Sequence, residues 1–449
     1  MEKRRRLLLI NPVNQHRRGF LLRQESMQAP LGLGMVAAAT PPEWNVRIWD
    51  ENFRPFRFRE ADVVGITAFT STCNRAYEIA ALYREKGIPV VMGGIHASTL
   101  PDEAKQHVDS VVIGEAESVW PVVLRDIEKG NLKPVYRGGF CGMNQIPAPR
   151  HDLFHPAYYF ASIQTSRGCP MNCDFCSVPA FNGYQYRFRE TESILDEIAG
   201  VNKNLLYFVD DNIIGYNSQA HDHAMSLFEG MVKKKLKKEW FAQASLNIAD
   251  QTDILKAAAA SGCRMLLIGI ESESEAGLKA SNKKINLKIG VNHYKEAFRK
   301  IHRHGIGVLG AFIYGLDTDT PADIRKRTDY INRSSVDVVQ ASVLTPLPGT
   351  RVFEKIQNEK RLLKTNYPDD WKRYHFIEVV HKPLSMEANE LAESVNAAYR
   401  RISNRFRIYI RFVRTLWNTR SLRTAVWCYH SNMNYRMMAF EQKLDFPIK

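Results

Sequence analysis

The chain has 449 residues, of which 45% are hydrophobic, 24% charged and 10% aromatic. This length and composition indicate a globular protein of two or three domains. No apolar run approaches the roughly 18 residues that a membrane-spanning helix needs. The basic start is followed by only a short apolar stretch, Leu7 to Ile10, which predicts a buried strand and not a signal peptide. We therefore expect a cytoplasmic protein.

The net charge of +14 raises the question of nucleic-acid binding. Much of the excess lies near the C-terminus, where no acidic residue occurs between Glu393 and Glu441. The arginines of that stretch are Arg400, Arg401, Arg405, Arg407, Arg411, Arg414, Arg420, Arg423 and Arg436. The basic character is thus partly a property of the tail, and a catalytic core need not share it.

Residues 1–135 alternate strand and helix signals, which predicts a doubly wound, flavodoxin-like α/β domain. Short runs typical of strands buried in a parallel sheet lie at residues 6–11, 46–50, 63–67, 89–93 and 110–114. Helical patterns separate them at about residues 30–40, 74–86, 100–107 and 118–129. Residues 136–160 are rich in Gly, Pro and Asn, and we interpret them as a linker.

A second alternation fills residues 161–365. Candidate strands lie at residues 162–167, 205–210, 240–245, 265–271, 308–314 and 336–344, with helices at about 191–202, 219–236, 252–261, 287–304 and 321–333. Six such units predict a partial (β/α)6 barrel, in which the chemistry is expected at the carboxyl ends of the strands. Residues 366–449 are predicted to form a helical, arginine-rich C-terminal region.

Three of the seven cysteines, Cys169, Cys173 and Cys176, follow the first strand of this second alternation. Fe–S clusters normally take four cysteines, so three on one loop leave one iron open to a substrate or cofactor. The four scattered cysteines do not form a disulfide pattern. A zinc site completed by His151 or His155, or a redox thiol pair, is the alternative that the residues themselves leave open.

The segment Cys169-Pro-Met-Asn-Cys173-Asp-Phe-Cys176 resembles the CxxxCxxC motif of the radical S-adenosylmethionine (SAM) superfamily. The resemblance implies a [4Fe–4S] cluster on the three cysteines, SAM on the open iron, and an external one-electron reductant. It further implies SAM contacts at the strand ends, from Phe175, Asp210, Asp211, Gln243, Ser245, Glu271, Gly310 and Gly315.

Residues 1–135 are similar to the cobalamin-binding domain that precedes many radical SAM cores. The matching stretches are residues 30–33, 46–51, 65–67, 93–96 and 113–117. They imply cobalamin near Thr67, Gly93, Gly94, His96, Gly114 and Glu115. The chain departs from the cobalamin mutases in lacking Asp-x-His-x-x-Gly, so no histidine ligand to cobalt is implied. Around Trp371, Pro383 and residues 386–399, the C-terminal region is diffusely similar to relatives of hopanoid C-2 methylases.

The resemblance implies methyl transfer from cobalamin to an unactivated carbon of a small-molecule or lipid substrate. The sequence also fits radical SAM cyclisation, oxidation or rearrangement without methyl transfer, or a non-catalytic, metal-stabilised binding protein. For the basic tail, three interpretations stay open: a packed helix with solvated arginines, a cap on the barrel that offers arginines to an anionic substrate, or a peripheral contact with an anionic membrane. Nucleic acid is disfavoured because no RNA-binding module is evident.

Overall fold

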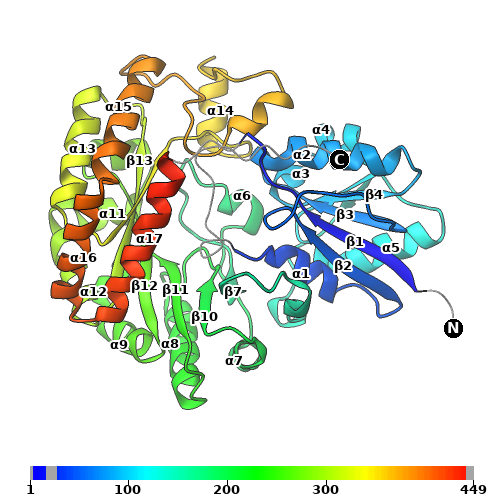
Figure 1. The fold of residues 1–449 in the computed structure, drawn as a ribbon, viewed down its shortest axis with the longest axis horizontal. Helices are drawn as coiled ribbons and strands as arrows, with labels where there is room; N and C mark the ends of the chain where they lie inside the picture. Colours follow the sequence, from blue (N-terminus) through cyan, green and yellow to red (C-terminus); the bar gives the residue numbers. More distant parts are fainter. Residues whose placement is uncertain (1–3, 17–27, 441–449) are drawn as a thin grey trace.

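The computed structural model describes residues 4–16 and 28–440. They form two parallel sheets, each covered by helices, and a group of C-terminal helices. The first sheet lies at the right of Figure 1 in blue and cyan, and the second lies at the left in green and yellow.

The first sheet has six parallel strands in the order β2-β1-β3-β4-β5-β6. The strands are β1 (Arg5–Asn11), β2 (Trp44–Asp50), β3 (Val63–Thr67), β4 (Val90–Gly93), β5 (Ser110–Ile113) and β6 (Val135–Arg137). The predicted doubly wound α/β domain is confirmed. Strand β6 was not predicted, because three residues are too short for a period-2 pattern and they lie at the edge of the proposed linker.

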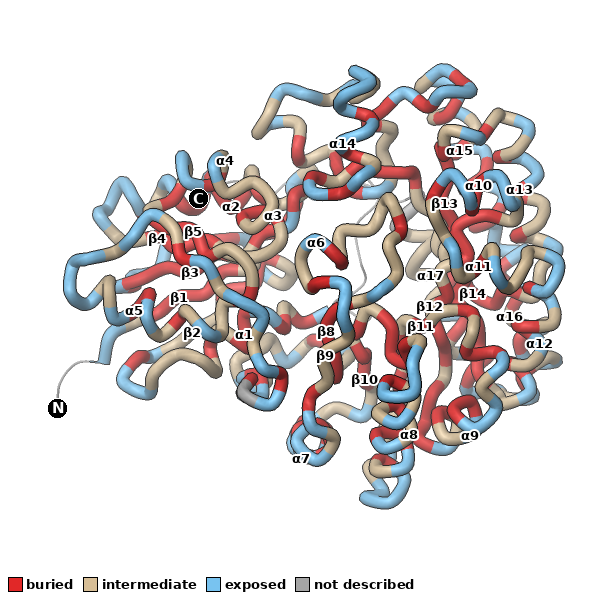
Figure 2. The backbone as a smooth tube through the Cα atoms, turned by 180° about the vertical axis from the view of Figure 1, so that it is seen from behind, coloured by how far each residue is buried: buried red, intermediate tan, exposed pale blue. Residues whose placement is uncertain are grey.

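Both faces of the first sheet are covered, as the apolar runs of its strands require. Along β1, Leu7 and Leu9 belong to one core cluster, whereas Leu8 and Ile10 belong to another on the opposite face. Figure 2 shows the strands as mostly buried. The helices of this domain are α1 (Leu31–Ala38), α2 (Cys73–Arg84), α3 (Ile95–Thr99), α4 (Pro101–His107) and α5 (Trp120–Glu128).

The second sheet also has six parallel strands, in the order β14-β13-β12-β11-β10-β7, and confirms the partial barrel. These strands are β7 (Phe160–Ile163), β10 (Leu205–Phe208), β11 (Glu239–Ala244), β12 (Cys263–Glu271), β13 (Gly307–Tyr314) and β14 (Val338–Val343). The predicted strand at residues 162–167 is divided, since Ser166 and Arg167 form β8 and pair with β9 (Arg187–Phe188). The predicted helix at residues 287–304 is divided too, because Gly290 takes a left-handed conformation with φ +84°.

Helices cover the outer face of the barrel sheet, and the last helix covers part of its inner face. The remaining helices are α6 (Val178–Asn182), α7 (Thr191–Gly200), α8 (Ser218–Lys233), α9 (Thr252–Ala260), α10 (Glu275–Ala280), α11 (Lys284–Ile289), α12 (Tyr294–His302), α13 (Pro321–Arg333), α14 (Arg351–Asn358), α15 (Ala388–Ile402), α16 (Arg405–Thr419) and α17 (Leu422–Phe440). Cys428 of α17 packs in one cluster with Met265, Leu309 and Val338, and Figure 1 shows α17, in red, crossing in front of β12 and β13. The arginine-rich tail therefore closes part of the open barrel.

Residues 359–387 contact both domains: His381 and Met386 contact the barrel, whereas the segment around Trp371 packs against the first domain. Trp371 and Tyr374 belong to the same core cluster as β1, β3 and α2. The indole nitrogen of Trp371 donates to the Glu103 carboxylate at 2.9 Å. The region 366–449, which we predicted as one unit, is thus divided between the two domains.

Across the described residues, the structure contains no helix that is both long and apolar enough to cross a bilayer.

Candidate functional site

The cysteine loop begins where β8 ends and is held from both sides. Gly168 has φ +91°, and a Cβ there would lie 2.1 Å from the Gln185 carbonyl oxygen, so only glycine fits. The Cys169 amide donates to the Gly183 carbonyl at 3.2 Å, and the Cys176 amide donates to the Cys173 carbonyl at 3.2 Å. The loop is therefore ordered by its own backbone and by the turn that follows α6.

The three cysteines line a single cavity and are free thiols. At least two of their three sulfur atoms are more than 4.8 Å apart. Among the described residues, the trio of potential metal ligands that lies within this distance is Cys73, His96 and Glu103. One zinc ion would draw three thiolates closer than this, since Zn–S bonds are about 2.3 Å long. The wider spacing fits a multi-iron cluster.

Burial raises the pKa of all three thiols, to about 12 for Cys176. Without metal these thiols are protonated at neutral pH, so binding of a cluster must displace their protons.

The cavity has a volume of about 1500 Å³ and opens beside the cysteine loop. Five of the residues predicted to contact SAM line it: Phe175, Asp211, Gln243, Ser245 and Glu271. Burial raises the pKa of Asp211 to about 6, although the Asn182 amide donates to this carboxylate at 3.1 Å. The other three predicted residues, Asp210, Gly310 and Gly315, are not among the lining residues.

Asp210 holds the start of the cysteine loop. Its fully buried carboxylate accepts hydrogen bonds from the Thr165 amide at 3.1 Å and the Thr165 hydroxyl at 2.7 Å. It also accepts from the Ser166 hydroxyl at 2.6 Å and from the Ser166 amide. These bonds use its acceptor sites, so in this structure Asp210 holds the start of the cysteine loop and does not line the cavity.

Glu271 forms a buried ion pair with Lys283 on the cavity wall. Their Oε1 and Nζ atoms are 2.8 Å apart, and both residues line the cavity. Burial lowers the pKa of Lys283, but Glu271, together with Cys173 and Tyr216, outweighs this effect, and the net shift is upward. Glu271 has φ +61° at an irregularity where β12 leaves its register with β13. This strained backbone turns the carboxylate toward the lysine.

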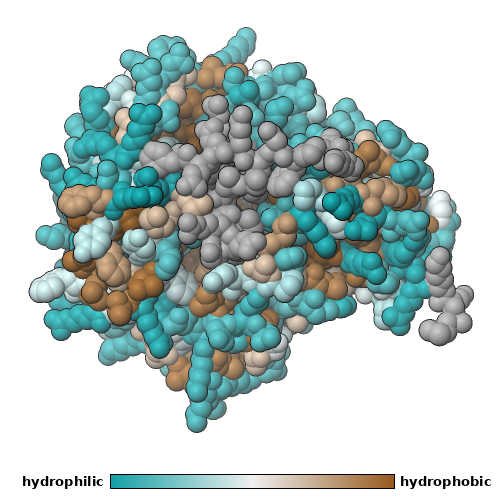
Figure 3. Space-filling model, in the orientation of Figure 1, coloured by the Kyte–Doolittle hydropathy of each residue, from teal (hydrophilic) through white to brown (hydrophobic). Residues whose placement is uncertain are grey.

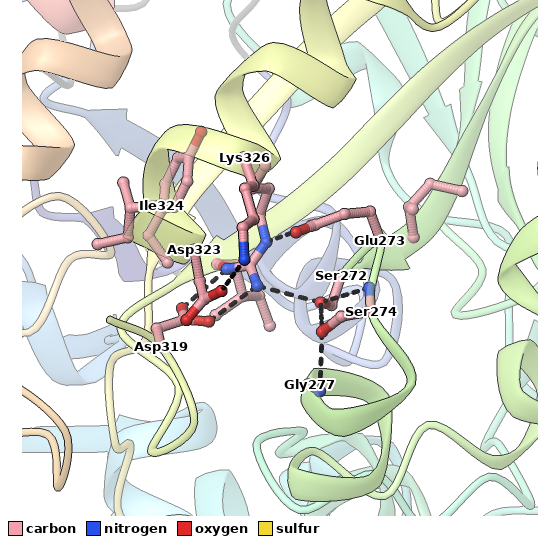
Figure 4. A network of polar contacts seen from close by, with 12 residues as sticks. Ser272, Glu273, Ser274, Gly277, Asp319, Asp323, Ile324 and Lys326 are labelled. Carbon is pink, nitrogen blue, oxygen red and sulfur yellow. Dashed lines mark hydrogen bonds and ion pairs between the residues drawn. The ribbon is translucent and has the colours of Figure 1, made fainter. Parts of the chain in front are cut away.

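Gly315 belongs to a loop fixed by a buried ion pair rather than to the cavity. Asp319 accepts from the Gly315 amide at 3.0 Å and lies 2.8 Å from the Arg327 guanidinium, which also contacts Ser272 and Glu273. Figure 4 shows Asp319 and Asp323 on one side of this network and Ser272 and Glu273 on the other. The network joins the loops after β12 and β13, two walls of the site.

Gly310 is buried within β13, where a Cβ would lie 3.0 Å from Phe312 and Val336. This glycine serves packing in the sheet, because the contacts that a side chain would make are with neighbouring core residues.

The residues predicted near cobalamin lie at the carboxyl edge of the first sheet, and this edge faces the cysteine loop. Glu115 forms ion pairs with Arg167 at 3.2 Å and with Arg187, while Glu117 lies 2.5 Å from Arg167. Since Arg167 directly precedes Gly168, these pairs fasten the two domains next to the cysteines. The Glu115 carboxylate therefore takes part in ion pairs that join the two domains, and these pairs occupy both of its oxygen atoms.

His96 is fully buried and does not face a cavity. Its Nε2 lies 2.9 Å from the Tyr77 hydroxyl and 3.1 Å from Glu103, with Cys73 close by. Among the other predicted residues, Gly94 has φ +92° and a Cβ there would lie 2.7 Å from Thr67 Oγ1. Gly114 has φ +80°, and a Cβ there would lie 2.6 Å from the Gly138 carbonyl oxygen, while its amide donates to the Ser98 hydroxyl at 2.9 Å. At Gly93, the atom nearest to a Cβ would be the Val112 carbonyl oxygen at 3.8 Å.

Family comparisons agree with this arrangement of the two domains. Residues 163–331 match the Radical SAM superfamily, and residues 22–124 match the B12 binding domain. Bacteriochlorophyllide d C-12(1)-methyltransferase from Chlorobaculum tepidum is 31% identical over 88% of this chain and 86% of that protein. The chain belongs to the B12-binding radical SAM family.

Two further relatives are similar over most of the chain. Hopanoid C-2 methylase from Rhodopseudomonas palustris is 30% identical over 74% of this chain and 65% of that protein. The solved structure of the cobalamin-dependent SAM radical enzyme OxsB has a TM-score of 0.72 at 16% identity, and covers 97% of this chain and 72% of that one. The second likeness shows the shared fold.

The B12-binding radical SAM family uses a [4Fe–4S] cluster, SAM and cobalamin, and the described residues fit the first two. The three thiols are suited to hold such a cluster, and the polar wall next to them carries groups suited to SAM. For cobalamin, the fold and the glycine-rich edge fit, whereas His96 and Glu115 are engaged in other contacts. The histidines of the zinc alternative are engaged too: His151 lies 2.9 Å from Glu197, and His155 stacks on Phe53.

Three residues that line the cavity were not predicted as site residues from the sequence: Lys283, Tyr207 and Tyr216. Lys283 lies in the polar run Ser281-Asn-Lys-Lys284, which reads as an exposed turn. No local pattern distinguishes a lysine that turns into a cavity from one that faces solvent. Burial raises the pKa of both tyrosines to about 12, so their hydroxyls stay protonated and available as donors.

Proposed function

We propose that this protein is a cobalamin-dependent radical SAM methyltransferase that acts on an unactivated carbon of a small-molecule or lipid substrate. The observation that carries this proposal is the cavity next to the cysteine loop. Its wall is polar beside the cysteines and apolar beyond them, so a reactive group formed at the polar end meets a substrate in surroundings with little water. A dry site is needed because a primary carbon radical attacks most C–H bonds within reach.

When bound, the cluster and SAM supply a radical that abstracts hydrogen, and cobalamin supplies a methyl group. The chain's own residues bind and orient these partners. Cys169, Cys173 and Cys176 hold the cluster, and an external one-electron reductant feeds it.

For SAM, we assign the polar wall to its charged and hydroxyl groups. Asp211 and Glu271 are acceptors for the amino group, while Lys283 is a donor for the carboxylate. Gln243 and Ser245 offer hydrogen bonds to the ribose, and Phe175 offers an aromatic face to the adenine. Lys283 Nζ already lies 5.9 Å from the Phe175 ring centroid, so these groups border one compact space.

Anaerobic reconstitution followed by product analysis tests the proposal. The reconstituted enzyme, with reductant, SAM and cobalamin, is expected to consume SAM to both S-adenosylhomocysteine and 5′-deoxyadenosine in the presence of substrate. Formation of 5′-deoxyadenosine alone would instead support cyclisation, oxidation or rearrangement. A protein that takes up iron and sulfide but never cleaves SAM would contradict the enzyme assignment.

We also propose a peripheral contact with an anionic membrane, made by an apolar surface on α16 and α17. Its exposed residues are Phe406, Tyr409, Val413, Leu416 and Trp417 on α16, and Leu422, Val426 and Tyr429 on α17. We call this the α16–α17 surface. Figure 3 shows hydrophobic atoms gathered over these two helices. Trp417 and Phe406 are 83% and 69% exposed, which is unusual for large apolar side chains unless they meet a partner.

The charges around this surface favour an anionic lipid partner. Arg405, Arg407, Arg420 and Arg423 are exposed on the same two helices, and no acidic residue occurs there. Each arginine near an anionic bilayer contributes about 1 kcal/mol. Flotation with phosphatidylcholine vesicles, with or without phosphatidylserine, tests this contact. We expect binding only with phosphatidylserine and its loss in Phe406→Ser/Trp417→Ser; equal binding to neutral vesicles would contradict it.

A further inference from the structure

The cavity does not end at the SAM wall but continues along the inside of the barrel to the opposite end of the sheet. Its lining includes Asn204, Lys237 and Glu239, which lie at the amino ends of β10 and β11. It also includes Leu422, Arg423 and Val426 from the first turns of α17. The space therefore reaches from the cysteines to the far mouth of the barrel, which we define by Lys237, Glu239, Leu422, Arg423 and Val426.

The chemical character of the lining changes along this length. Strand positions alternate in direction, so every second residue of β11, β12 and β13 faces the cavity. Toward the carboxyl ends these residues are polar, as with Gln243 and Glu271. In the other half the strand residues are mostly apolar and aromatic: Phe241, Met265, Leu267 and Leu309, with Tyr207 of β10 and Val339 of β14. Gln340 of β14 and His430, Ser431 and Asn434 of α17 add polar groups to this lining. The rings of Tyr207 and Phe241 stack with centroids 4.3 Å apart, and Phe160 bridges Phe241 and Trp427.

Charge returns at the far mouth and is mainly positive. Glu239 is already paired with Arg264 at 2.8 Å, and Arg423 approaches the same carboxylate at 3.4 Å while remaining largely exposed. Lys237 is exposed at the rim. Two arginines thus share one carboxylate, and with Lys237 the rim of the opening carries a net positive charge.

We propose that the apolar half of the cavity binds the body of an amphiphilic substrate, and that Lys237 and Arg423 bind its anionic end. This rests on the proposed function, since it names the substrate class for the same site. The polar wall near the cysteines is complementary to SAM and not to a hydrocarbon. Burying an apolar body in the other half contributes about 25 cal/mol per Å², and the anionic end then lies where cations meet water.

Leu422 and Val426 also connect this mouth with the exterior. Both residues line the cavity and belong to the exposed α16–α17 surface. An amphiphile can therefore pass from that surface into the barrel along a continuous apolar path, without its apolar body crossing open water.

Binding of cis-parinaric acid, a fluorescent fatty acid, to the full chain tests the proposal, with its methyl ester as the uncharged probe. We expect saturable binding of both probes. Leu267→Trp, which fills the middle of the cavity, is expected to weaken binding of both probes about tenfold or more. Val232→Trp adds the same kind of side chain at an exposed position of α8 and is expected to change nothing. If Leu267→Trp does not fold, Ala341→Leu fills the same lining less drastically.

A second set of variants tests whether Lys237 and Arg423 bind the anionic end of the probe. The double variant Lys237→Gln/Arg423→Gln is expected to weaken binding of the acid about tenfold and to leave binding of the methyl ester unchanged. Lys233→Gln, on the exposed end of α8, serves as the matched control. Binding that is unaffected by Leu267→Trp and Ala341→Leu overturns the apolar site, and an unchanged preference for the acid overturns the anionic end. Because probe binding needs neither cluster nor SAM, failure of SAM cleavage would count against the proposed function alone.

Discussion

The Glu271 carboxylate lies 2.8 Å from the Lys283 ammonium, and the Gly269 backbone leaves the space for both. A Cβ at Gly269 would lie 2.4 Å from Glu271 Oε1 and 2.6 Å from Lys283 Nζ. Both atoms are at the ends of flexible side chains. A methyl group there therefore displaces the pair at little cost to the fold.

Gly269→Ala is accordingly expected to weaken SAM binding about tenfold while the cluster remains bound, as is Glu271→Ala. Equilibrium dialysis of SAM against the anaerobically reconstituted protein measures this. Gly200→Ala is the matched control, since a Cβ there meets nothing within 4 Å. Equal SAM affinity in both glycine variants would show that the Glu271–Lys283 pair does not contribute to SAM binding.

Replacement of Cys169, Cys173 or Cys176 by Ala is expected to abolish cluster absorbance and all SAM cleavage, because we propose each thiolate as one of three protein ligands to the cluster. Iron and sulfide analysis with visible spectra measures the loss. Cys73, Cys141, Cys263 and Cys428 to Ala serve as controls and are expected to retain the cluster. Loss of iron in one of these four would mean that the ligand set is incomplete.

Arg327→Met is expected to destabilise the barrel by about 3–5 kcal/mol, since it leaves the buried Asp319 carboxylate without its ion pair. Urea unfolding followed by circular dichroism measures the change. The neighbouring Lys326→Met changes an exposed residue and is expected to stay within about 0.5 kcal/mol. Similar midpoints for the two variants would argue against a structural role for the network in Figure 4.

The Glu378 carboxyl is expected to make the stability of the fold sensitive to acid. Burial raises the pKa of this carboxyl, but His375 and Arg373 outweigh that effect and hold it at about 2, below its usual value of 4.5. The stability that it contributes is therefore present above about pH 4.5 and is lost as the pH falls toward 2. Thermal unfolding across this window measures it: Glu378→Gln is expected to flatten the pH dependence, whereas the exposed Glu393→Gln is not. A parallel profile for the wild type and Glu378→Gln would contradict the assignment.

The sequence predicted the elements that local patterns encode. Short runs rich in β-branched and other apolar residues located five strands of the first sheet and all six of the barrel. Among the elements that it missed or merged, β6, β9, α3, α6 and α10 are short, and the break at Gly290 depends on the backbone conformation of one residue. Predicted cavity residues such as Gln243, Ser245 and Glu271 were found because strand ends in a parallel barrel face one mouth.

Contacts between distant segments could not be predicted in this way. Asp210 and Asp211 are adjacent in sequence, yet one holds the cysteine loop and the other lines the cavity, because successive residues at a strand end point in opposite directions. Likewise, the basic tail allowed a cap on the barrel as one of three interpretations, but its repeated arginines did not show that α17 covers the inner face of the barrel sheet.

By itself, the sequence determined the chemistry of this protein, since three thiols on one loop and the alternation of β/α units are local properties of the chain. Tertiary structure alone decided what surrounds those thiols: Lys283 beside Glu271, Arg423 at the far mouth, and Trp371 on the first domain. Those positions depend on contacts between residues far apart in the chain, and no local pattern specifies which distant residue a side chain will meet.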